Sequence, residues 1–144
     1  MVNAIGLGIA QKIRTVFSES DYRLYTESIE QGFEEPCFFV SLINHTQKQR
    51  FANRYKEIYL FEVIYYPSVG GNKNEECLAV AEGLFELLEY ISAEDDLLRG
   101  TNLSSKITEG VLHFYVEYNM FVIREKEPEE NMGEVIIYGE TIEW

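Results

Sequence analysis

Basic residues are scarce in this sequence. Only 12 Lys and Arg stand against 25 Asp and Glu, which gives a formal net charge of -13. Binding to nucleic-acid phosphates or to an anionic membrane surface depends on Lys and Arg, so neither is expected as the primary partner. Long apolar runs are also lacking, and none approaches the roughly 20 residues that a membrane-spanning helix needs. The N-terminal stretch has no basic leader before its apolar part, so no secretory signal is expected.

Residues that carry catalytic or metal chemistry are few as well. Cys37, Cys77, His45 and His113 are the only cysteines and histidines, and their spacing matches no zinc-ligand motif, in which ligands come in close sequence pairs. The GxSxG, Walker, HExxH and Rossmann patterns are absent. Both cysteines are expected to be buried thiols in a reducing cytoplasm. The sequence therefore predicts no catalytic residue, no metal site and no cofactor.

Apolar and aromatic residues, in contrast, are sufficient for one core. The chain has 144 residues, of which 46% are hydrophobic and 14% are aromatic, and this length suits one domain. We expect a single α+β domain over residues 1–126, with a mixed or mainly antiparallel sheet packed against two helices. Residues 127–144 are expected to form an acidic C-terminal tail with a short β-like segment.

Strands are predicted near residues 37–47, 56–66 and 111–124, where β-branched and aromatic side chains alternate. In the first strand, alternation places Phe38, Val40 and Leu42 on one face and His45 on the other. Helical spacing of apolar residues predicts helices over residues 3–18 and 74–91, the second ending at Ile91. A turn is expected at Glu109-Gly110.

A basic segment lies between the first two predicted strands. It contains Lys48, Arg50, Arg54 and Lys56, in a chain that is otherwise acidic. One interpretation is a solvated loop, and an equally weighted one is a contact surface for an acidic partner such as another copy of this chain. DNA is the least favoured partner.

The acidic tail contains four consecutive strand-formers, Val135, Ile136, Ile137 and Tyr138. Such a segment exposed to water would promote aggregation, so it is expected to pair with a strand. Pairing with a neighbouring subunit is slightly favoured over pairing within the chain.

The stretch YTESIEQGFEEPCFFVSLINHTQKQRFANRYKEIYLFEVIYYP resembles the phage tail terminator proteins of tailed phages and prophages in Gram-positive hosts. Leu98-Arg99-Gly100 and the segment EGVLHFYVEYNMFV extend the resemblance, which covers roughly residues 10–125 in the same order. These motifs are structural, and the resemblance implies no enzymatic step and no cofactor.

The resemblance also implies a function and partners. Proteins of this family form a ring, commonly a hexamer, that caps the tail tube, stops its polymerisation and provides the head-docking surface. The implied partners are copies of the chain itself, the tail tube protein and a head-completion or connector protein, with DNA only passing through the lumen and no membrane. The implied location is the head-proximal end of the virion tail, after assembly in the host bacterial cytoplasm.

Two other classes of function remain open on the sequence. One is another neck or tail component, such as a tail completion or tube-like protein. The other is a small-molecule-binding domain, or an enzyme whose site has no recognisable motif. Mass measurement in native conditions distinguishes these classes from a closed ring.

Overall fold

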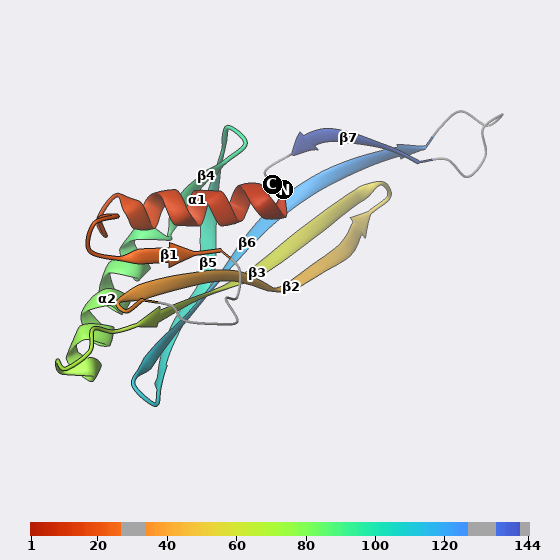
Figure 1. The fold of residues 1–144 in the computed structure, drawn as a ribbon. Helices are drawn as coiled ribbons and strands as arrows, with labels where there is room; N and C mark the ends of the chain where they lie inside the picture. Colours follow the sequence, from red (N-terminus) through yellow and green to blue (C-terminus); the bar gives the residue numbers. More distant parts are fainter. Residues whose placement is uncertain (27–33, 127–134, 142–144) are drawn as a thin grey trace.

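The computed structural model describes residues 1–26, 34–126 and 135–141. Its strands form one curled sheet of seven strands in the order β1-β2-β3-β6-β5-β4, with β7 added on β6 (Figure 1). β1 pairs with β2 in parallel and the other pairs are antiparallel. The predicted α+β class with a mixed, mainly antiparallel sheet and two helices is confirmed. The elements are α1 (Val2–Arg14), β1 (Arg23–Tyr25), β2 (Cys37–Phe51), β3 (Arg54–Tyr66), α2 (Lys73–Leu87), β4 (Tyr90–Ala93), β5 (Asp96–Thr108), β6 (Val111–Lys126) and β7 (Val135–Thr141).

Both helices cover the same face of the sheet, where they form the hydrophobic core. α1 contributes a stripe of Ile5, Ile9 and Ile13, all fully buried, and it contacts both β2 and β4, strands from the two sides of the curled sheet. Gly8 permits the contact with β4, because a Cβ atom there would lie 2.4 Å from the Ser92 carbonyl oxygen. Neither described helix is long and apolar enough to cross a membrane.

The second helix is shorter than predicted. α2 begins after Asn72, whose Oδ1 accepts a hydrogen bond from the Glu75 backbone at 3.2 Å, and it ends at Leu87 rather than at residue 91. Ile91 is buried as the helical spacing suggested, but it belongs to β4. The backbone N–H of Gly100 donates to the Glu89 carbonyl at 2.6 Å, which ties the chain after α2 to β5.

A β-bulge changes the predicted faces of β2. The register runs from Leu42 opposite Phe61 to Asn44 opposite Leu60, so Ile43 is an extra residue in β2. Because side chains alternate with a period of two, one extra residue moves all later side chains to the other face. His45 consequently lies opposite Tyr59, on the same face as Phe38 and Val40, and the predicted opposite placement is wrong.

The C-terminal strand-formers lie in β7, which pairs with the far end of β6. Its register places Val135 opposite Lys126 and Ile137 opposite Arg124. The sequence slightly favoured pairing with a neighbouring subunit, but the structure pairs this strand within its own chain. The acidic residues 127–134 between the two strands, and residues 142–144, lie outside the described part of the chain.

Candidate interaction arm

The sheet extends well beyond the helices. We call the projecting part, residues 44–57 and 121–126, the arm. β2 residues beyond Ser41 are exposed except for Thr46, and Figure 1 shows β2, β3 and β6 running out together past the end of α1. The hairpin turn at Ala52-Asn53 forms the tip of the arm, where Ala52 has φ 53°.

The predicted basic residues gather on one face of this arm. Lys56 alternates with the core-facing Glu57 and therefore points to the face opposite the helices, and Lys48 lies directly opposite Lys56 in the β2–β3 ladder. Arg50 and Arg54 join them at the tip. We call this surface, made by Lys48, Arg50, Arg54 and Lys56, the basic face.

The pairing of Lys48 with Lys56 is unfavourable within one chain. Like charges directly opposite each other on neighbouring antiparallel strands destabilise the pair. Within the described residues, neither lysine belongs to an ion pair that would offset this repulsion. The face therefore has a positive charge available to an external acidic group.

Aromatic side chains accompany the charges at the tip. Phe51 is 75% exposed, and the Arg50 guanidinium lies 6.0 Å from the centre of the Phe121 ring, a cation–π contact. A hollow of about 280 Å³ is lined by Arg50, Phe51, Arg54 and Phe121. The tip thus combines positive charge with apolar surface, a combination that suits protein contact.

The inner face of the arm contains a polar network around Glu57. This carboxylate is only 7% exposed and is the single buried charged residue among those described. The Gln47 amide donates to Glu57 Oε1 at 2.8 Å, and His45 Nε2 lies 3.3 Å from Glu57 Oε2. The His45 ring also stacks on Tyr59 with centroids 4.3 Å apart. Residues of β2 and β3 are thereby linked across the arm.

Arg124 links β6 to the same network. Its Nη1 donates to Gln47 Oε1 at 3.0 Å, its Nη2 lies 3.8 Å from Glu57 Oε1, and its guanidinium lies 4.3 Å from the centre of the Tyr55 ring. These contacts join all three strands and give the arm internal support where the helices give none. Sequence reasoning missed this network, although alternation from Tyr59 and Phe61 already places Glu57 on the core face.

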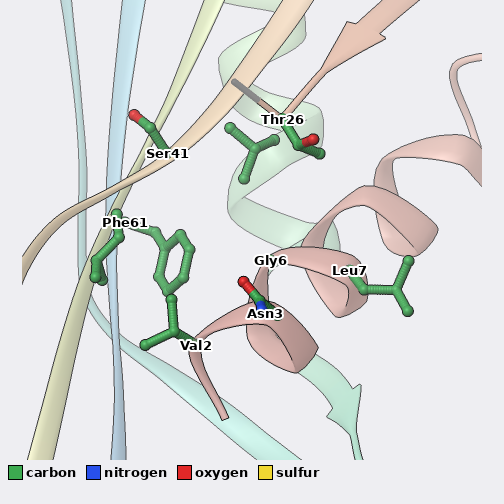
Figure 2. A pocket seen from close by; sticks show the side chains of 9 residues that line it. Val2, Asn3, Gly6, Leu7, Thr26, Ser41 and Phe61 are labelled. Atoms are coloured by element: carbon green, nitrogen blue, oxygen red, sulfur yellow. The ribbon is translucent and has the colours of Figure 1, made fainter. Parts of the chain in front are cut away.

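A shallow groove lies beside α1, on the main body of the protein. It has a volume of about 310 Å³, and Figure 2 shows Val2 and Phe61 facing each other within it. None of the nine described residues that line it is ionisable, so these residues offer apolar contact rather than acid–base chemistry. The lining residues are Val2, Asn3, Gly6, Leu7, Thr26, Val40, Ser41, Leu42 and Phe61.

The four residues considered for chemistry are Cys37, Cys77, His45 and His113, and each has an ordinary structural environment. Burial raises the pKa of the Cys37 thiol from 9.0 to about 12, with a smaller contribution from Glu35, so this thiol is protonated at neutral pH and is a poor nucleophile. Burial likewise raises the pKa of Cys77. His113 Nδ1 lies 2.9 Å from Glu62 Oε2, as His45 pairs with Glu57. Within the described residues, no group of three or more His, Cys, Asp or Glu is arranged to hold a metal.

The structure places Val135, Ile136, Ile137 and Tyr138 in β7, a different strand from those that carry the basic face. β7 extends the sheet along β6 on the side opposite β3. The two sets of predicted contact residues therefore belong to one projecting sheet, but they are separated by β6.

Comparison with known proteins places the chain in a family. A solved structure of 12% sequence identity aligns with 88% of this chain and 94% of its own chain, at a TM-score of 0.40. No curated protein matches significantly. A family model described as "Phage tail terminator protein" matches residues 5–130, which include most of α1, all of α2 and strands β1 to β6. The chain therefore belongs to the phage tail terminator family and has a structural role in the phage tail.

Proposed function

We propose that this chain is a tail terminator that forms a ring, caps the tail tube and stops its polymerisation. In this family the ring is commonly a hexamer. The ring would also provide the head-docking surface, at the head-proximal end of a tail assembled in the host cytoplasm. Its partners would be further copies of the chain, the tail tube protein and a head-completion or connector protein. The role is one of non-covalent assembly, without an enzymatic step.

The observation that carries this proposal is the arm. In an isolated monomer, the projecting sheet leaves Lys48 and Lys56 repelling each other and the apolar Phe51 side chain exposed to water. Both features are unfavourable unless a partner covers them. Lys48, Arg50, Arg54 and Lys56 would contact a neighbouring subunit or the tube, where acidic groups relieve the repulsion between the lysines.

β7 provides a second candidate contact. One of its edges pairs with β6, and no described strand pairs with its other edge. Val135, Ile136, Ile137 and Tyr138 would contact the adjacent subunit or the tube through main-chain hydrogen bonds on that second edge.

The acidic composition suits a conduit for DNA. With a formal charge of -13, a closed ring would present a lumen that repels the phosphate backbone. DNA would pass through without binding, which agrees with the small number of basic residues in the chain.

Native mass spectrometry of the purified chain tests the proposal directly. A closed ring of one defined mass is expected, whereas open polymers of many lengths would favour a tube protein and a strict monomer would refute ring formation. Electron microscopy of tails assembled with and without the chain tests the capping role. Without it, tails should lose their uniform length, and unchanged tails would contradict the terminator function.

A further inference from the structure

We propose that the arm of one copy docks on the outer face of α2 in the next copy of the same chain. This inference rests on the proposed ring and names the two surfaces that would join its subunits. The arm supplies the basic face and the aromatic tip, and α2 supplies an acidic and apolar surface. The join is head-to-tail, with different surfaces on the two copies.

The outer face of α2 carries the charge opposite to that of the basic face. Glu75, Glu82 and Glu86 are exposed and recur at helical spacing, so they form one stripe. Residues 74–98 contain no Lys or Arg, and none of these three carboxylates belongs to an ion pair within the described part of the chain. The stripe is therefore available to an external cation.

Apolar side chains accompany this acidic stripe, as they accompany the basic face of the arm. Leu78 is 56% exposed and Phe85 is 39% exposed. They follow Glu75 and Glu82 by three residues each, so they lie beside the acidic stripe on the helix surface. The hollow at the arm tip, beside Phe51, offers an apolar side chain from α2 a place to insert. Charge pairing and apolar contact therefore favour the same docking.

The positions of the two surfaces determine how they can meet. Figure 1 shows α2 and the tip of the arm at opposite ends of the molecule, so the arm cannot reach its own α2. Contact between copies is then heterologous, and a heterologous contact generates a ring when its rotation closes. Because a chain of charge -13 repels its copies, bringing the basic face against the glutamates also lowers that repulsion.

Charge exchange between the two surfaces tests the proposal. The arm variant carries Lys48→Glu and Lys56→Glu, and the helix variant carries Glu82→Lys and Glu86→Lys. Each alone places like charges in every interface, so its ring fraction in native mass spectrometry should fall at least about tenfold. A control variant with Lys12→Glu and Lys106→Glu changes the charge as much as the arm variant does and should still form rings.

Two combinations should restore the ring. A chain with all four substitutions has complementary charges again and should assemble alone. An equal mixture of the arm and helix variants should assemble as well, in rings where the two alternate, and alternation permits only even subunit numbers. Circular dichroism and thermal melting of each variant show whether it is folded.

A covalent test does not depend on charge. Phe51→Cys with Leu78→Cys in one chain should give an intermolecular disulfide ladder on mild oxidation, while either substitution alone should give at most dimers. Absence of the ladder, or failure of both charge combinations to restore rings, would overturn the docking model while leaving the ring itself intact. A wild-type chain that forms no ring would overturn both the docking model and the proposed function.

Discussion

Replacing Glu57 by Ala tests how the arm is held together. The carboxylate is the shared partner of Gln47, His45 and Arg124, which come from two other strands of the arm. Its removal leaves the Arg124 guanidinium without its ion-pair partner and His45 without the carboxylate beside its ring. The strands remain connected by their backbone ladder, so we expect a destabilised arm rather than an unfolded protein.

The magnitude follows from the exposure of the partners. Removing one member of a fully buried ion pair costs roughly 3–5 kcal/mol, but here the His45 and Arg124 side chains retain 39% and 24% exposure and can be partly solvated. Hydrogen bonds to charged groups contribute roughly 1.5–3 kcal/mol each when they are well formed. We therefore expect Glu57→Ala to cost about 2 kcal/mol, and Glu57→Gln less because its amide oxygen can still accept from Gln47.

Urea unfolding followed by circular dichroism measures this cost, at a concentration where the chain is monomeric so that assembly does not contribute. Glu19→Ala, an exposed glutamate in a loop, is the matched control and should change the stability little. Combining Glu57→Gln with Arg124→Met in a double-mutant cycle isolates the coupling between the two groups. A loss below about half a kilocalorie for Glu57→Ala, with zero coupling, would refute the reasoning.

Four further outcomes are expected. Leu84→Ala or Phe114→Ala, each at a fully buried position, should lower the free energy of unfolding by roughly 2–5 kcal/mol, and a loss under half a kilocalorie at both sites would show that the core is misplaced. Folding raises the pKa of Cys37 from 9.0 to about 12, so the stability that its neutral thiol contributes is fully present below pH 9 and is lost as the pH rises towards 12. Across this pH range, the urea midpoint of Cys37→Ala should therefore fall less steeply with pH than the midpoint of the wild type. Lys48→Thr should raise the monomer's free energy of unfolding by about 0.2–1 kcal/mol but lower the fraction of chains in rings. A change of both quantities in the same direction would contradict this. Truncation after Lys126 removes β7, which lies outside the helix-covered core, so the melting temperature should stay nearly constant while hydrogen exchange at the end of β6 rises and ring formation falls.

The sequence predicted the elements whose local pattern agrees with their burial. Alternation in β3 and β6 identifies the faces correctly, since every second residue from Tyr59 to Tyr65 and from Leu112 to Met120 is buried. The Glu109-Gly110 turn was also predicted correctly, and both residues have positive φ. In these segments one periodicity holds over many residues, so tertiary contacts reinforce the local preference.

The errors occurred where a single residue or a distant contact decides the structure. Ile43 shifts the register of β2, and nothing in its apolar neighbourhood distinguishes a bulge residue from an ordinary strand residue. Ile91 satisfies helical spacing from Leu84 and Leu88, yet its segment pairs with β5. The network around Glu57 depends on the Ile43 bulge, because only the shifted register brings His45 and Gln47 to the same face as that carboxylate.

The two faces of the arm have opposite effects on the stability of the monomer, and this contrast bears on function. The inner face holds β2, β3 and β6 together through a network around the buried Glu57, while the outer face sets Lys48 against Lys56 across two of the same strands. If the arm served only the fold of one chain, replacing either lysine by a neutral strand-former would improve it. The repulsion between the lysines is offset only when acidic groups from outside lie against both of them, because each lysine then has an opposite charge beside it. A rigid arm with an unfavourable outer face is therefore better suited to an assembled subunit than to a free one, and this is the physical reason to look for its partner among the acidic surfaces of the tail.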